Sequence, residues 1–221
     1  MASYKSHMAF GILTGIGWCV VLIFFSIASL WLMPFVFIIT VLGSFLPDLD
    51  SDTGLPIKIL LIILSTIGSL LVGWTAIYLY QTNLVTATGF ILVSIILIYY
   101  FFGGFIKRLT HHRGMFHSIP AAALSILISL ALFDSIGLSN EIIIVLSVSV
   151  GLGYLSHLIL DEINSVVNLE GIPFIPKKSL GTALKFYSKD WRVSLIVYIL
   201  VVLLSIKYWK IFENFIIGIR L

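Results

Sequence analysis

The chain has 221 residues, of which 60% are hydrophobic and 10% charged, and its formal net charge is +3. Soluble domains average about 45–50% apolar and about 25% charged residues, so the composition argues against a soluble protein and predicts an integral membrane protein. The single cysteine, Cys19, excludes a disulfide within the chain, and its place in an apolar run suits a small packing residue.

Seven apolar segments follow one another along the chain, at residues 8–28, 30–47, 57–80, 84–105, 118–133, 142–160 and 193–212. Backbone polar groups in lipid must bond within their own segment, so these segments are predicted to be helices. The first run is longer than the 7–15 apolar residues of a signal peptide, and we expect it to be retained. The sequence therefore predicts an all-α, polytopic transmembrane bundle of about seven helices in a single integral membrane domain, 1–221.

The basic residues predict the orientation of these spans. When the flanks are numbered alternately from the N-terminus, the first, third and fifth loops carry no Lys or Arg, and the last tail, with Lys207, Lys210 and Arg220, departs from the alternation. This asymmetry places the N-terminus and the second, fourth and sixth loops in the cytoplasm. Their cations are Lys5, Lys58, Lys107, Arg108, Arg113, Lys177, Lys178, Lys185, Lys189 and Arg192.

Histidines and aspartates gather at the span ends on this cytoplasmic side. Ionisable side chains near a bilayer are costly and usually have a function, and imidazoles with carboxylates are typical transition-metal ligands. We therefore expect one metal site at the cytoplasmic helix ends. The candidate ligands are His7, Asp48 and Asp50 in LPDLD, His111, His112 and His117 in HHRGMFH, and His157 and Asp161 in HLILD.

Small and weakly polar residues continue from these candidates into the spans at four-residue spacing, which is one helix face. Such residues mark helix–helix interfaces in membrane bundles. The candidates are therefore expected to face neighbouring helices rather than lipid, although ordinary small-residue packing would give the same stripes. The stripes are Gly11 and Gly15, Thr40 and Ser44, Ala121, Ser125 and Ser129, and Ser149 and Gly153.

Two acidic motifs allow more than one interpretation. HLILD places His157 and Asp161 one helical turn apart, so both could bind one ion, or they could form a hydrogen-bonded pair. In LPDLD, Pro47 is expected to end a helix, and the two aspartates could bind one ion, bridge two, or cap helices in a solvated loop. Asp50 is also a candidate general base.

The segment HHRGMFHS combines ligands with a possible substrate contact. His112 and His117 flank a glycine-containing turn, and Ser118 is predicted to cap the fifth helix with Pro120 in its first turn. Arg113 could bind a substrate oxyanion bidentately, or it could serve only as a topology-setting charge. His111 is a further ligand or an outer partner that orients one.

A basic, aromatic segment at residues 171–192 separates the metal-site core, about 4–170, from the last span at 193–212. Its composition is typical of a segment that lies in the membrane interface and attracts anionic head groups. A topology-setting loop and a substrate-binding lid both remain open.

Four motifs resemble the YdjM-like family of bacterial membrane-bound metal-dependent hydrolases: SHMAFGILTG, GSFLPDLDSD, HHRGMFHS and GYLSHLILDEIN. Their order and spacing fit over about residues 4–170, but Phe116 stands where the family usually has Thr. The resemblance implies a distant relationship to zinc-dependent phospholipases C and related nucleases, and hence a phosphoester hydrolase of the bacterial cytoplasmic membrane. Carried over residue by residue, the resemblance implies as ligands His7, Asp48, Asp50, His112, His117, His157 and Asp161. Mixed histidine and carboxylate ligands suit zinc, with manganese or iron as alternatives, and seven or eight ligands could hold two or three divalent ions.

The leading hypothesis is a metal-dependent hydrolase that cleaves a phosphoester of a lipid or lipid-linked substrate at the cytoplasmic face, with Asp50 as proton acceptor and Arg113 steadying the charge. A metal-ion or proton transporter is an alternative, disfavoured because transport sites usually lie near the bilayer midplane. A non-catalytic, metal-stabilised membrane protein is another, disfavoured because the chain offers more ligands than one closed site uses. No nucleic-acid motif occurs, and the oligomeric state stays open.

Overall fold

The computed structural model describes residues 4–50, 55–109, 115–166, 184–188 and 190–219, and within these ranges it contains helices and no β-strand. Each of the seven predicted spans corresponds to an α-helix, so the predicted all-α class is confirmed. Two short 3-10 helices, η1 (Leu30–Leu32) and η2 (Leu46–Asp50), flank the second α-helix. The α-helices are α1 (Tyr4–Phe24), α2 (Met33–Gly43), α3 (Leu55–Tyr78), α4 (Leu84–Leu109), α5 (Ile119–Ser135), α6 (Asn140–Val166) and α7 (Trp191–Ile219).

Helix ends differ from the predicted spans for local reasons. The first helix ends at Phe24, because Ser26 adopts a left-handed backbone conformation (φ 52°) that breaks the helix. The α2 helix ends at Gly43, so the prediction that Pro47 ends it is wrong, and Pro47 lies instead within η2. The sixth helix continues past residue 160 to Val166, which keeps Asp161 helical.

Five stretches of the described residues are long and apolar enough to cross a membrane. The α5 helix is apolar but has only 17 residues, whereas α7 has 29 and at 1.5 Å per residue rises roughly 43 Å. The last helix is therefore long enough to cross completely. The five stretches are Lys5–Phe24, Leu30–Asp48, Leu84–Phe101, Asn140–Ser165 and Trp191–Ile217.

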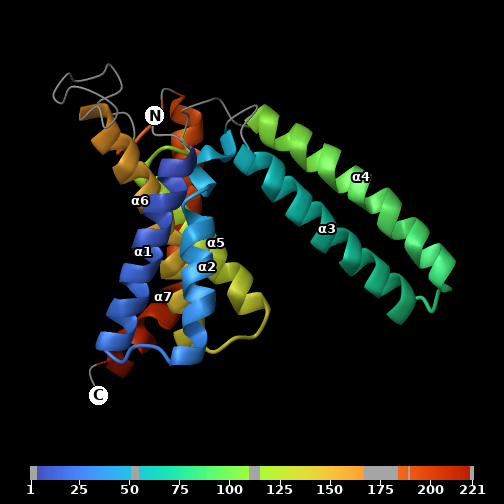
Figure 1. Cartoon of the computed structure of the whole chain (residues 1–221), viewed down its shortest axis with the longest axis horizontal. Coiled ribbons are helices and arrows are strands. Elements are labelled where there is room, and N and C mark those ends of the chain that lie inside the picture. The colour runs from blue at the N-terminus through green and yellow to red at the C-terminus, as the bar shows by residue number, and fades with distance from the viewer. Residues whose placement is uncertain (1–3, 51–54, 110–114, 167–183, 189, 220–221) are drawn as a thin grey trace. The chain divides into compact units, whose positions relative to one another are not determined.

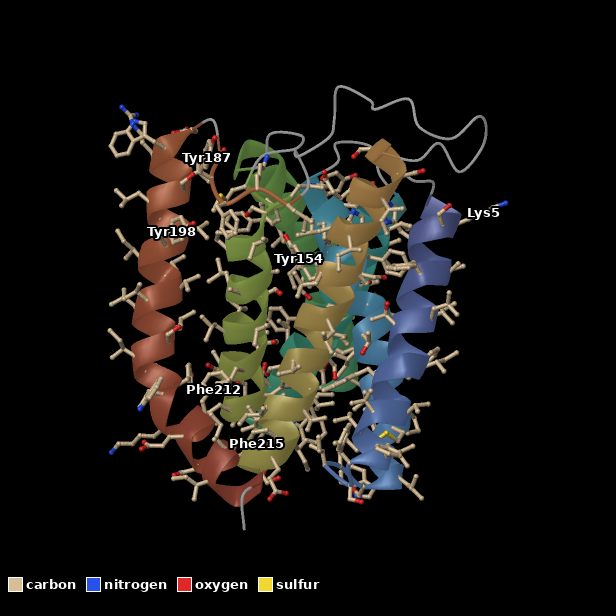
Figure 2. The ribbon with its side chains drawn as sticks, turned by 90° about the vertical axis from the view of Figure 1, so that its left-hand side faces the viewer. Lys5, Tyr154, Tyr187, Tyr198, Phe212 and Phe215 are labelled. Carbon is tan, nitrogen blue, oxygen red and sulfur yellow. The ribbon has the colours of Figure 1, made fainter. Side chains whose placement is uncertain are left out.

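Internal contacts divide the chain into two compact units, one of residues Met1–Pro47 with Arg113–Leu221 and one of residues Asp48–His112. The first unit contains α1, α2, α5, α6 and α7, which lie side by side as a helical bundle (Figures 1 and 2). The second contains α3 and α4, which pair as a hairpin (Figure 1). The single domain expected for the whole chain, 1–221, stays a prediction.

Apolar side chains form three clusters inside the bundle. One joins α1, η1, α2 and α6 through Leu22, Leu32, Met33, Val36, Val145 and Leu146. A second joins α5, α6 and α7 through Leu130, Ile143 and Tyr208. The third, formed by Ala122, Tyr154 and Leu158, joins α5 to α6 close to the predicted metal ligands.

The α2 and α6 helices approach each other so closely that their backbones touch. A Cβ atom on Gly153 would overlap the carbonyl oxygen of Thr40, and one on Gly43 would overlap the carbonyl oxygen of Val150. The α1 helix is similarly close, since a Cβ on Gly11 would overlap the Ser44 side chain. The predicted small-residue interfaces are thus confirmed for α1, α2 and α6.

In the hairpin, α3 and α4 also approach each other closely at a glycine. A Cβ on Gly73 of α3 would overlap the side chain of Ile91 on α4. Between the helices, Gln81 adopts a left-handed conformation (φ 48°) that turns the chain. Asn83 then caps α4, because its Oδ1 accepts a hydrogen bond from the Thr86 backbone amide at 2.8 Å.

Candidate metal centre

The predicted ligands within the bundle come from helices whose starts or ends lie at the same end of the bundle. Figure 2 shows the starts of α1, α5 and α7 and the end of α6 at one end of the bundle, here called the site end. Lys5 and Tyr187 are labelled at the site end, whereas Phe212 and Phe215 are labelled towards the opposite end (Figure 2). The topology therefore gathers predicted ligands from three separate segments: α1, the turn before α5, and α6.

Four predicted ligands are buried here: His7 on α1, His117 just before α5, and His157 and Asp161 on α6. Their exposed fractions are 2%, 2%, 1% and 7%, in that order. Among the described residues, no other histidine and no other charged side chain is buried. Because burying such groups is costly without compensating partners, their clustering indicates a built site.

The carboxylate of Asp161 lies at the centre of this cluster. Its Oδ1 is 3.3 Å from His7 Nε2, and its Oδ2 is 3.9 Å from His117 Nε2 and 3.8 Å from His157 Nε2. The His7 and His157 rings stack, with centroids 3.8 Å apart and an interplanar angle of 9°. The His117 ring meets the His157 ring edge-on, at 5.6 Å and 70°. All three Nε2 atoms thus surround one carboxylate.

The tautomer of His157 follows from its backbone contact. Its Nδ1 lies 2.8 Å from the carbonyl oxygen of Ser44, and a carbonyl can only accept, so Nδ1 carries the proton and donates. In the neutral ring, Nε2 therefore presents a lone pair towards Asp161. Ser44 caps α2, and carbonyls at a helix end lack intrahelical partners. A histidine that donates its other ring N–H to a carbonyl is typical of metal ligands.

The spacing of these atoms matches the coordination sphere of a small cation. His117, His157 and Asp161 each offer one ligand atom within 4.8 Å of the others. Tetrahedral zinc with ligand distances of about 2.0–2.2 Å holds its ligand atoms about 3.3–3.6 Å apart. The observed nitrogen–oxygen separations of 3.3, 3.8 and 3.9 Å are close to that range.

His7 supplies a second, independent indication. Both of its ring nitrogens are buried, and neither makes a hydrogen bond with a described residue. Even the 3.3 Å approach of Nε2 to Asp161 lacks hydrogen-bond geometry. Because buried polar atoms are nearly always satisfied, this imidazole suits a ligand to a cation. The chemistry of the donor set, three imidazoles and one carboxylate, suits zinc.

The turn that carries His117 is held by its neighbours. The predicted cap is confirmed, since the Ala121 backbone amide donates to Ser118 Oγ at 3.3 Å and Pro120 lies in the first turn of α5. Ser118 Oγ in turn donates to the Met115 carbonyl, and the Tyr154 hydroxyl on α6 donates to the Phe116 carbonyl. The contact of Tyr154 was not predicted, although its position three residues before His157 places it on the same helix face.

The structure does not test the other predicted site residues. Asp48 is half-buried in η2 and is the first residue of the second unit. Asp50 ends η2, and its side chain lies outside the described set. His111, His112 and Arg113 lie outside the described residues. Ligand and catalytic roles for these five stay predictions.

Part of the basic, aromatic segment is also described, at residues 184–188 and 190–192. The Lys185 carbonyl accepts a hydrogen bond from the Ile119 amide at 3.0 Å, and the Phe186 carbonyl accepts one from the Tyr198 hydroxyl at 2.9 Å. The segment is thus tied to the starts of α5 and α7, with Phe186, Tyr187 and Trp191 exposed. Residues 171–183 and Lys189 lie outside the described set, and the choice between topology loop and lid stays open.

Comparison with known proteins identifies one family. A family model described as YdjM inner membrane protein matches residues 1–220. Comparison with curated proteins and with solved structures gives no match. Because the family match spans nearly the whole chain, the chain belongs to the YdjM inner membrane protein family. This confirms the predicted family and membrane location, whereas the hydrolase activity, the metal dependence and the relationship to phospholipase C stay predictions.

Proposed function

We propose that this member of the YdjM inner membrane protein family is a metal-dependent hydrolase. Zinc, with manganese or iron as alternatives, binds His7, His117, His157 and Asp161. Asp48, Asp50 and His112 complete the ligands for a second or third ion. His111 is a further ligand or an outer partner that orients one. The substrate is a phosphoester of a lipid or lipid-linked molecule, reached from the cytoplasmic face.

The observation that carries this proposal is the arrangement of three imidazoles around the Asp161 carboxylate. The His157 lone pair is directed into the cluster by the bond from Nδ1 to the Ser44 carbonyl, and the His7 nitrogens are buried without hydrogen bonds among the described residues. Mixed imidazole and carboxylate donors suit zinc and its neighbours in the first transition series. The cluster therefore fits a metal better than an ordinary polar contact between helices.

The chain's own residues account for the remaining steps. When bound, zinc supplies Lewis acidity that polarises a phosphoryl oxygen and acidifies water. As the water oxygen bonds to phosphorus, Asp50 accepts its proton, the ester P–O bond breaks, and the leaving alcohol takes up a proton from solvent. Arg113 binds the phosphate oxygens through its planar guanidinium. The exposed aromatic side chains of Phe186, Tyr187 and Trp191 hold the apolar part of an amphiphilic substrate at the interface.

The cytoplasmic orientation rests on the distribution of Lys and Arg. Lys5, at the start of α1, marks the site end of the bundle (Figure 2), and Lys185 and Arg192 belong to the segment tied to the same end. A transporter is less well supported, because the buried histidines and the buried aspartate of the described residues lie at one end of the bundle.

The test uses the full chain, purified in detergent or nanodiscs and assayed for bound metals. Zinc-loaded protein is then incubated with a panel of phospholipids, isoprenoid phosphates and model phosphodiesters. We expect at least one zinc per chain, with turnover that His157→Ala abolishes and Trp18→Phe, remote from the cluster, preserves. Zinc-loaded protein without turnover on any member of the panel would contradict the hydrolase.

One observation favours a second candidate, a non-catalytic site in which metal only holds the helices together. The ligands are nearly fully buried and come from α1, α6 and the start of α5, as in a structural staple. Removing metal with a chelator lowers the unfolding temperature under both candidates, because a ligand that binds only the folded chain stabilises it. If His157→Ala keeps the fold and loses no phosphoesterase activity relative to the wild type, a purely structural metal site is favoured.

A further inference from the structure

We infer that Tyr154 is a positioning residue for the metal ligand His117, which it holds in place through the backbone of Phe116. This inference rests on the proposed metal site. Tyr154 lies in the motif GYLSHLILDEIN, from which only His157 and Asp161 were predicted to have a role. Tyr154 is labelled on α6 in Figure 2.

The side chain of Tyr154 is built into the bundle. It is 2% exposed, and its ring packs in the cluster with Ala122 of α5 and Leu158 of α6. Its hydroxyl donates a hydrogen bond to the carbonyl oxygen of Phe116. A buried tyrosine hydroxyl needs such a partner, and here the partner belongs to the turn that carries a ligand.

His117 needs this support because it lies in a turn, before α5 begins at Ile119. The Phe116 carbonyl and the His117 amide belong to one planar peptide unit. Holding that carbonyl therefore sets the direction in which the chain enters His117. The bonds from Ser118 to the Met115 carbonyl and from Ile119 to the Lys185 carbonyl attach to different peptide units.

The same helix that supplies Tyr154 also supplies the other two ligands of the three-residue group. Tyr154, His157 and Asp161 lie three and four residues apart, on one face of α6. A single rigid helix thus carries two ligands and the group that positions the third. The turn that Tyr154 contacts holds His117 Nε2 at 3.9 Å from Asp161 Oδ2.

The test compares zinc affinities of the full-length chain in detergent, measured by competition with a chromophoric chelator. Tyr154→Phe removes one oxygen atom and keeps the ring in its cluster. We expect a zinc affinity about 10–100-fold weaker, the usual effect of losing an outer partner of a ligand. Trp18→Phe is the matched control, because it also removes one hydrogen bond to α6, from the indole to Ser149 Oγ, about two helical turns before His157, and its affinity should equal that of the wild type.

A double-mutant cycle with His117→Ala separates positioning from general structure. If Tyr154 acts through His117, Tyr154→Phe has no further effect on zinc affinity once His117 is removed. An equal loss in both backgrounds, or no loss in either, overturns the role of Tyr154 while leaving the metal site intact. A wild-type chain that binds no zinc overturns the proposed metal site itself.

A measurement on the wild-type chain covers the case in which Tyr154→Phe fails to fold. If Tyr154 holds the turn, the amides of residues 115–119 and 121 should exchange slowly with deuterated solvent in zinc-free protein. Zinc should then add little protection. Fast exchange that becomes slow only with zinc would show that metal, and not Tyr154, orders the turn, and would overturn the inference.

Discussion

The sharpest prediction concerns Gly153, where α6 meets the backbone of α2. In Gly153→Ala the added Cβ would overlap the carbonyl oxygen of Thr40 and would lie 2.9 Å from the Ser44 amide nitrogen. Both atoms belong to backbone, so no side-chain rotation relieves the clash. The two helices must separate by roughly 1.5 Å to restore an ordinary contact distance of about 3.5 Å.

Two losses follow from that separation. Overpacking of a close interface costs about 1–3 kcal/mol, and we expect the upper end because the atoms met are main-chain atoms. The 2.8 Å contact between His157 Nδ1 and the Ser44 carbonyl also crosses this interface. Lengthening it by about 1 Å breaks the hydrogen bond, which should weaken zinc binding about 10–100-fold.

Unfolding in detergent mixtures and zinc competition measure the two losses separately. Gly17→Ala is the matched control, because a Cβ there meets nothing within 4 Å and should be neutral or stabilising by up to about 1 kcal/mol. A Gly153→Ala chain as stable as the wild type, with unchanged zinc affinity, would refute the close packing of α2 on α6 and the dependence of His157 on it.

Three other predictions follow from the same structure. Asp161→Asn removes the charge that three imidazoles face, so zinc affinity measured by chelator competition should fall by more than about 100-fold, beyond the loss of an outer partner. Trp18→Phe removes the 3.0 Å hydrogen bond from the indole to Ser149 Oγ. The free energy of unfolding should fall by about 0.6 kcal/mol, and the zinc affinity should not change. A changed zinc affinity would contradict the remoteness of that contact from the ligands. In a Cys19→Ser background, a membrane-impermeant thiol reagent applied outside spheroplasts should label Asn83→Cys and spare Lys5→Cys, and the reverse pattern would overturn the predicted orientation.

Much of the bundle could be predicted from the sequence, because a long apolar segment in lipid satisfies its backbone hydrogen bonds by forming a helix. The glycine and serine stripes correctly indicated where α1, α2 and α6 approach. Helix ends were predicted less well, since they depend on local backbone geometry such as the left-handed Ser26. The end of α2 at Gly43, rather than at Pro47, is another such case.

The cluster was predicted in part. Alternation of the spans and the four-residue phase indicated that His7, His117, His157 and Asp161 would converge, and the structure brings them together. Two supporting groups were missed for physical reasons. The Ser44 carbonyl is a backbone acceptor, which no residue type reveals, and the role of Tyr154 depends on a contact 38 residues away along the chain.

The short α5 helix has a consequence for the membrane around the cluster. Its 17 residues rise about 26 Å at 1.5 Å per residue, a few ångströms less than the hydrocarbon thickness of about 30 Å. A bilayer adapts to a short segment by thinning locally. If α5 crosses the bilayer, we expect the leaflet surface to dip near its start, where His117 stands. Such a dip would bring lipid phosphates closer to the imidazoles while the acyl chains stay in the leaflet.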